Sequence, residues 1–156
     1  MEYGIALTAG TFDPVTKGHL DIIRRAADMC AVLIVGIFEN PEKKPLFPLE
    51  KRFEALCAAT MDIDNAVVIT NDGMLFEYAK EAWVEVIIKG VRSENDRAYE
   101  QKQADFNFEH SGIKTILLEA DPQYKDVSST LVRRLISEGK NVSHYVPEAA
   151  LSVLKG

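Results

Sequence analysis

Five short apolar runs, separated by segments of a different period, are the feature that most constrains the fold of this chain. The runs read as continuous apolar stretches, which is the pattern of strands covered on both faces of a sheet. The segments between them repeat apolar side chains at helical spacing, and crossovers between parallel strands are right-handed. This alternation predicts one α/β domain over residues 1–156, a Rossmann-like doubly wound parallel sheet of five strands. The predicted strands are residues 3–7, 31–38, 66–70, 84–88 and 114–118, and the predicted helices are residues 20–30, 49–60, 74–83 and 95–111, the stretch between Ser128 and Gly139, and residues 147–154.

Composition excludes several classes of protein. The 156 residues are 47% hydrophobic, which is typical of a globular chain, and no apolar run approaches the roughly 20 residues of a membrane span. A formal charge of −6, from 18 basic and 24 acidic residues, argues against a general binder of nucleic acid or of anionic membranes. No secretory signal is visible, and Cys30 and Cys57 are expected on the apolar sides of helices. We therefore expect buried free thiols and a cytoplasmic protein.

The stretch from Thr8 to His19 connects the first predicted strand to the first predicted helix. It contains Gly10, Thr11, Asp13 and Pro14, residue types that favour a tight turn. In a parallel sheet such a turn lies at the carboxyl end of a strand, where ligands bind. The N–H groups at the start of the following helix attract anions.

Three further polar segments are expected at the same edge of the sheet. Residues 89–92 follow the fourth strand, residues 127–130 open a helix after the fifth strand, and Lys43 and Lys44 lie on a proline-rich loop after the second strand. Each has an ordinary structural explanation, as a rim charge, a helix N-cap or a solvated loop. Lysine, arginine, and hydroxyls at a helix start are also the groups that bind phosphates. Their occurrence together favours a polyphosphate site.

Four other residues are expected to be structural. Asp13 is predicted to support its turn through backbone N–H groups rather than to bind a metal. Trp83 is expected in the core or at an interface, and His110 and His144 on the surface or in structural positions.

Four segments resemble phosphopantetheine adenylyltransferases of the bacterial type, members of the nucleotidyltransferase superfamily. They are the opening motif 10–19, the lysine-bearing segment 40–47, the segment 89–100 with its Asp-x-x-Tyr-Glu spacing, and the helix start 127–134. Two positions depart from the family pattern. Ala9 stands where the family usually has proline, and Lys89 stands where it usually has arginine, so that the charge is kept and the planar fork is lost.

The resemblance implies adenylyl transfer from ATP to 4′-phosphopantetheine, which gives dephospho-CoA and pyrophosphate. His19 would stabilise the charge that develops on the α-phosphate, in a protonation state that the sequence leaves open, and Thr11 would bridge the two substrates. Lys43, Lys89, Met74 and Leu75 would contact phosphopantetheine. The resemblance places the contacts with ATP at Thr11, Phe12, His19, Gly90, Val91, Arg92, Glu100, Tyr124, Lys125, Asp126, Val127, Ser128, Ser129 and Thr130. Gly90 is expected to let the backbone approach the nucleotide closely.

Cofactor and assembly are also expectations from the resemblance. Mg²⁺ would arrive with ATP, held mainly by phosphates and water. The family resemblance further implies a homohexamer and feedback by CoA. The negative net charge and the lack of a membrane span predict no nucleic acid or membrane as partner.

Other functions remain open at this stage. A cytidylyltransferase acting on glycerol 3-phosphate and an adenylyltransferase acting on nicotinamide mononucleotide share the opening turn, although the lysine loop and the spacing from Arg92 to Glu100 argue against them. A non-catalytic nucleotide sensor could use the same fold, and His19 argues against it. A flavodoxin-like redox module is disfavoured because the turns of this chain at residues 89–92 and 127–130 are basic or rich in serine and lack aromatic residues.

Overall fold

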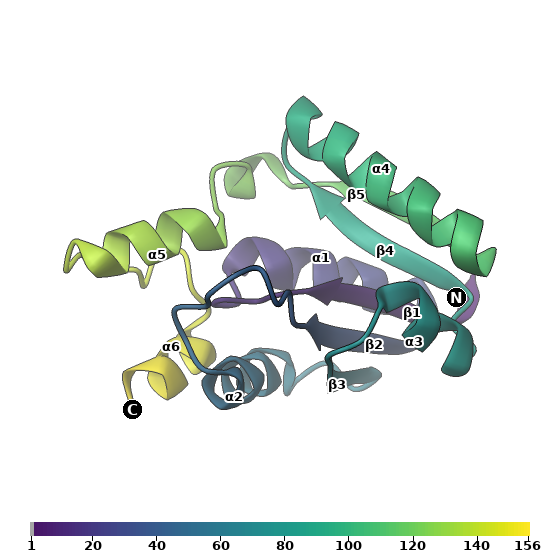
Figure 1. The fold of residues 1–156 in the computed structure, drawn as a ribbon. Helices are drawn as coiled ribbons and strands as arrows, with labels where there is room; N and C mark the ends of the chain where they lie inside the picture. The colour runs from purple at the N-terminus through teal and green to yellow at the C-terminus, as the bar shows by residue number, and fades with distance from the viewer. Residues whose placement is uncertain (1) are drawn as a thin grey trace.

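Strands and helices alternate along the chain, as the apolar pattern predicts (Figure 1). The computed structural model describes residues 2–156. The strands are β1 (Tyr3–Gly10), β2 (Cys30–Phe38), β3 (Ala66–Asn71), β4 (Val86–Val91) and β5 (Lys114–Glu119). The helices are α1 (Lys17–Ala27), α2 (Leu49–Thr60), α3 (Leu75–Glu81), α4 (Glu94–Ser111), α5 (Ser129–Ser137) and α6 (Glu148–Lys155), with a 3₁₀ turn, η1 (Pro122–Tyr124), before α5.

The five strands form one parallel sheet in the order β3-β2-β1-β4-β5. The direction in which the chain adds strands reverses between β1 and β4, because β2 and β3 extend the sheet on one side and β5 on the other. Such a reversal opens a crevice at the carboxyl ends of the two strands. The predicted Rossmann-like α/β fold is therefore confirmed.

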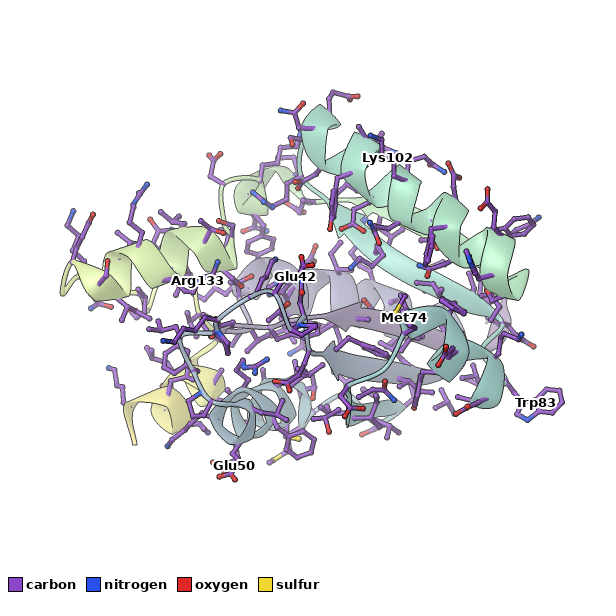
Figure 2. The ribbon with its side chains drawn as sticks, in the orientation of Figure 1. Glu42, Glu50, Met74, Trp83, Lys102 and Arg133 are labelled. Atoms are coloured by element: carbon purple, nitrogen blue, oxygen red, sulfur yellow. The ribbon has the colours of Figure 1, made fainter. Side chains whose placement is uncertain are left out.

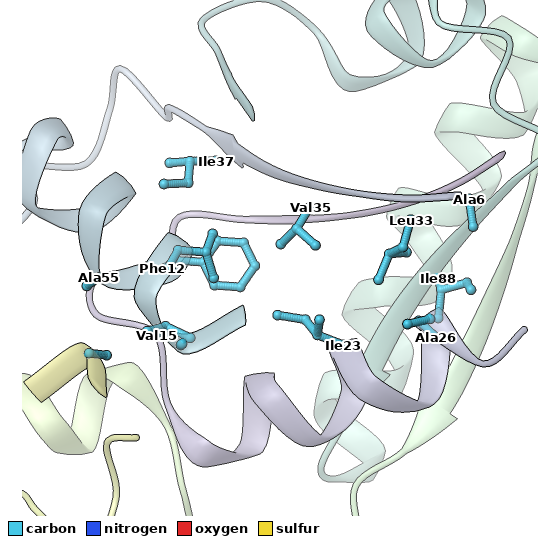
Figure 3. Packing of buried hydrophobic residues seen from close by; sticks show 14 of the residues in the cluster. Ala6, Phe12, Val15, Ile23, Ala26, Leu33, Val35, Ile37, Ala55 and Ile88 are labelled. Atoms are coloured by element: carbon cyan, nitrogen blue, oxygen red, sulfur yellow. The ribbon is translucent and has the colours of Figure 1, made fainter. Parts of the chain in front are cut away.

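The apolar core lies on both faces of this sheet. On one face α1 and α2 bury Ile23 and Leu56 in the core, α6 packs on α2 and adds Ala150 to the same cluster, and Figure 3 shows Ile23 close to Leu33 and Val35 of β2. On the other face a smaller cluster holds Ala79 of α3 against β1, β2 and β4. Helix α4 packs beside α3 over β4 and β5. Both faces being covered explains why the strands read as unbroken apolar runs.

Several boundaries differ from those predicted. Cys30 begins β2 instead of closing α1, which ends at Ala27 with Asp28 as its C-cap. The helical spacing runs on to Cys30 because a buried strand follows the helix almost at once. β4 extends through Val91, so Lys89 and Gly90 belong to the strand and not to a turn after it. Both cysteines are free thiols as expected, Cys30 buried and Cys57 partly so.

Trp83 is not in the core. Its side chain is 83% exposed, and Figure 2 shows it projecting away from the ribbon. It follows α3 at a positive φ of 59°, at the point where the chain leaves the helix for β4. A place at an interface stays a prediction. Across residues 2–156, no helix combines the length and the hydrophobicity needed to cross a membrane.

Candidate active site

The turn after β1 fixes His19 in one orientation. Thr16 is the N-cap of α1, and its Oγ1 accepts from the His19 N–H at 3.2 Å. His19 occupies the third helical position, where a capping box usually has Glu or Gln, and its Nδ1 accepts from the Thr16 N–H at 3.0 Å. Because Nδ1 is the acceptor, the proton of the neutral ring lies on Nε2. The capping box therefore leaves one ring N–H as a donor.

The surroundings of His19 keep the ring neutral. Burial first, and the positive charges of Lys89 and Arg92 second, together lower the pKa of His19 from 6.5 to about 4. Phe12, whose side chain is only 4% exposed, packs edge-on against the ring with centroids 5.0 Å apart. In the free protein at neutral pH, His19 is thus an uncharged N–H donor.

A pocket of about 340 Å³ opens beside His19, at the switch point between β1 and β4. It brings together most of the residues singled out from the sequence, although they come from segments more than 100 positions apart. Those that line it are Thr11, Phe12, His19, Lys43, Lys89, Gly90, Val91, Arg92, Glu100, Tyr124, Val127, Ser128, Ser129 and Thr130.

Four predicted contact residues lie outside this pocket. Lys125 and Asp126 are exposed on the segment between η1 and α5. Met74 and Leu75 line a separate pocket of about 260 Å³, which shares Lys89 and Glu100 with the first. Figure 2 shows Met74 just ahead of α3. The two pockets therefore meet along the Lys89–Glu100 pair.

The end of β4 supplies two cations to the pocket. Lys89 Nζ donates to the Ala9 carbonyl at 2.9 Å and lies 3.7 Å from Glu100 Oε2. Arg92 pairs through Nε with Asp96 Oδ2 at 3.4 Å. Both carboxylates that line the pocket wall here are thus matched to a cation.

Gly90 has a packing reason for being glycine in addition to the one predicted from the sequence. A Cβ at this position would lie 2.7 Å from Ile22 Cγ1 of α1. The missing side chain therefore lets α1 pack closely on β4, which is a helix–strand requirement. Gly90 also lines the pocket, and the close approach of a nucleotide to its backbone stays a prediction.

The start of α5 is joined to the opening turn. Ser128 is the N-cap, with Oγ accepting from the Leu131 N–H at 3.1 Å. Ser129 Oγ donates to the Pro14 carbonyl at 2.7 Å. Arg133 Nη1 donates to the Asp13 carbonyl at 2.9 Å, and Nη2 donates to Thr130 Oγ1 at 3.1 Å.

Arg133 lines the pocket and was not singled out from the sequence. Its position in the sequence could have indicated a place in the pocket. Arg133 follows Ser129 by four residues, which puts both side chains on one face of the helix.

Asp13 has a structural role, as predicted, but its carboxylate bonds N–H groups of a distant loop and not those of its own turn. Its carboxylate oxygens accept from the Leu46 N–H at 2.8 Å and the Phe47 N–H at 2.9 Å. His110 and His144 are exposed, and His110 Nδ1 lies 2.8 Å from the Phe106 carbonyl oxygen of its own helix.

The donor set at this pocket suits a polyanion. Lys43, Lys89, Arg92 and Arg133 surround the neutral His19 donor, and two helices begin there. Within residues 2–156 no three His, Cys, Asp or Glu side chains converge as ligands for a metal ion. Asp96 and Glu100 already face cations. The residues therefore fit phosphate groups better than a resident divalent metal.

Comparison with known proteins agrees with this chemistry. The cytidylyltransferase-like family matches residues 7–135. A phosphopantetheine adenylyltransferase from Caldanaerobacter subterraneus subsp. tengcongensis is 42% identical over 145 residues, which cover 92% of this chain and 91% of that protein. The one from Shouchella clausii is 39% identical over 96% of this chain and 95% of its own, and the one from Actinobacillus pleuropneumoniae is 36% identical over 99% and 98%.

A solved structure supports the fold alone. A Vibrio parahaemolyticus protein described as a nicotinate-nucleotide adenylyltransferase superposes with a TM-score of 0.71 at 16% identity, over 99% of this chain and 93% of that one. Fold and site together define a nucleotidyltransferase of the cytidylyltransferase-like class. Within this class, the chain belongs to the phosphopantetheine adenylyltransferase family.

Proposed function

We propose that the protein transfers the adenylyl group of ATP to 4′-phosphopantetheine and releases pyrophosphate, the step that yields dephospho-CoA. The observation that carries the proposal is the neutral Nε2–H of His19, held in a pocket with cations on two sides. Lys43 lies on the loop after β2 and Lys89 lies in β4, whereas the serines lie at the start of α5 and Arg133 in its middle. The family relationship supports the choice of substrates.

The chemistry needs no general base. The nucleophile is an oxygen of a phosphate monoester, whose second pKa of about 6 leaves it mostly dianionic at neutral pH. This oxygen bonds to the α-phosphorus of ATP while the bond from the α-phosphorus to the bridging oxygen breaks, and pyrophosphate leaves with that electron pair. The protein has to hold two anions together and to stabilise charge on the α-phosphate.

Each side of the pocket takes one substrate in this proposal. Lys43, Lys89 and Thr11 hold the acceptor phosphate, and its arm extends toward the adjoining pocket that Met74 and Leu75 line. The nucleotide contacts the end of β4, Glu100 and the segment from Tyr124 to Thr130, with Lys125 and Asp126 at the exposed rim. His19 donates to the α-phosphate from between them. Mg²⁺ enters as the ATP complex, held by phosphates and water.

A substrate panel tests the reaction. Pyrophosphate release should occur with ATP and 4′-phosphopantetheine in the presence of Mg²⁺, and should be absent with CTP and glycerol 3-phosphate or with ATP and nicotinamide mononucleotide. Turnover with one of these other pairs alone would assign the protein to a sister enzyme. Binding of ATP without turnover of any pair would make it a sensor.

We also propose a cytoplasmic homohexamer that CoA inhibits. Support for the assembly comes from apolar side chains left exposed, among them Trp83, Met61 and Phe108. Light scattering should give a particle six times the mass of the 17.4 kDa chain, and a mass of one chain would contradict this proposal. CoA carries the same phosphopantetheine arm as the acceptor, so adding it to the assay should slow pyrophosphate release.

A further inference from the structure

A closed ring of hydrogen bonds joins the opening turn to the lysine loop, residues 39–48. Asp13 Oδ1 accepts from the Phe47 N–H at 2.9 Å, and the Phe47 carbonyl accepts from Arg52 Nε at 3.0 Å. Arg52 Nη1 then donates to the Thr11 carbonyl at 3.1 Å. The ring thus holds Phe47 by both its N–H and its carbonyl, and it closes along the backbone from Thr11 to Asp13.

Both charged members of the ring are buried. The exposed fraction is 2% for Arg52 and 3% for Asp13. Arg52 Nη2 pairs with Glu39 Oε1 at 2.8 Å, and Asp13 receives a second N–H, from Leu46, at 2.8 Å. Buried charges are tolerated only where they are paired and hydrogen-bonded, and removing one partner leaves the other uncompensated. Another conformation of the loop that broke the ring would therefore leave a buried charge uncompensated.

The ring lies beside the acceptor end of the pocket. Thr11 and Lys43 line the main pocket and also a neighbouring pocket of about 320 Å³, whose wall includes Arg52 and Glu39. Lys43 is on the held loop and makes no side-chain hydrogen bond or ion pair to the part of the chain that the structure describes. The position of the Lys43 side chain relative to a ligand therefore depends on the position of this loop.

We propose that Arg52 is a positioning residue for the acceptor: through Phe47 and Asp13 it holds the lysine loop, and with it Lys43 and Thr11, at the acceptor phosphate. This inference rests on the proposed function, in which Lys43 and Thr11 bind that phosphate. Arg52 is not among the residues that line the main pocket. A loop held in its binding conformation has less conformational freedom to lose when the ligand binds, and displacement of a contact by about 1 Å can cost up to about 100-fold in rate.

Two conservative variants test the inference. Arg52→Lys keeps the charge but cannot donate to Phe47, Thr11 and Glu39 from three separate nitrogens. Asp13→Asn keeps one acceptor oxygen but turns an NH₂ group toward one of the two loop N–H groups. In each folded variant, KM for 4′-phosphopantetheine should rise at least about tenfold. In Arg52→Lys, which leaves the bond between Arg133 and Asp13 in place, KM for ATP should change less than about twofold, because most nucleotide contacts lie on β4 and α5. The Leu46 and Phe47 amides should also exchange hydrogen faster.

Arg24→Lys is the matched control. Arg24 pairs with Asp62 on the exposed surface, away from the ring, so both KM values and both exchange rates should match the wild type. Equal rises in both KM values with a loss of kcat would make Arg52 merely structural and overturn the inference, as would an unchanged KM for the acceptor. Failure of the wild type to turn over 4′-phosphopantetheine would instead overturn the proposed function.

Discussion

At the residue scale, His19 is the side chain on which turnover should depend most. Its Nε2–H is directed by the bond that Nδ1 accepts from Thr16, so the donor is in place before substrate arrives. We expect His19→Ala to lower kcat by about 10²–10³-fold, the usual cost of removing one donor to a developing charge. ATP affinity should change little, because the other groups that face the nucleotide remain. Pyrophosphate release and ATP titration measure the two effects.

Two amide replacements of His19 test whether Nε2, and not Nδ1, is the ring nitrogen that donates to the substrate. His19→Gln should retain more activity than His19→Asn, because only the longer amide can place an N–H near the position of Nε2. His144→Ala, which changes an exposed histidine, serves as control. Equal losses of ATP affinity and of turnover in His19→Ala would make His19 a binding residue and contradict the assigned role.

His19 should also make the stability of the fold depend on pH. Its pKa is about 4 in the folded protein against 6.5 for the unperturbed side chain, so between these values the unfolded chain binds more protons. The free energy of unfolding therefore falls as pH drops through this window, by up to about 3 kcal/mol. His19→Ala lacks this contribution and should lose less stability between pH 7 and pH 4. Urea unfolding at several pH values measures this difference. If the pKa of His19 were unshifted, the free energy of unfolding would depend on pH in the same way in the wild type and in His19→Ala.

At the element scale, the contact of α1 with β4 depends on Gly90. A Cβ there would meet Ile22 Cγ1 at 2.7 Å and Cδ1 at 3.1 Å, so Gly90→Ala must push the helix or force the isoleucine from its rotamer. We expect a loss of about 1–3 kcal/mol in the free energy of unfolding, as for other overpacked sites. Gly73→Ala is the control, since its Cβ would approach only Asn71 Oδ1, at 3.2 Å. A loss no larger than that of the control would contradict this packing argument.

Element boundaries show what local pattern can and cannot predict. The buried strands and the Ser128 cap follow from local chemistry, and the sequence predicts them well. The end of α1 cannot be predicted in this way, because Cys30 continues the helical spacing of the apolar residues although it belongs to β2. The end of β4 at Val91 depends on pairing with β5 as far as Glu119, which is a long-range contact.

At the scale of the whole molecule, the parallel sheet explains why so much of the pocket could be predicted. Carboxyl ends of parallel strands share an edge, so Lys43, Lys89 and Ser128 had to lie near the opening turn. Contacts between loops carry no such constraint. The bonds from Arg133 to Asp13, and from Arg52 to Phe47 and Thr11, join segments that no periodicity relates. These contacts therefore cannot be predicted from the sequence pattern and are visible only in the structure.

Asp13 belongs to both halves of the site at once. Its carboxylate holds the loop that carries Lys43, and its carbonyl receives the guanidinium of Arg133 from α5. A displacement of this one residue is therefore transmitted in both directions. If occupancy of one half moves Asp13, the affinity of the other half changes, and thermodynamic linkage makes the factor the same whichever substrate binds first. The turn is thus a physical route for cooperativity between the two substrates within a single chain.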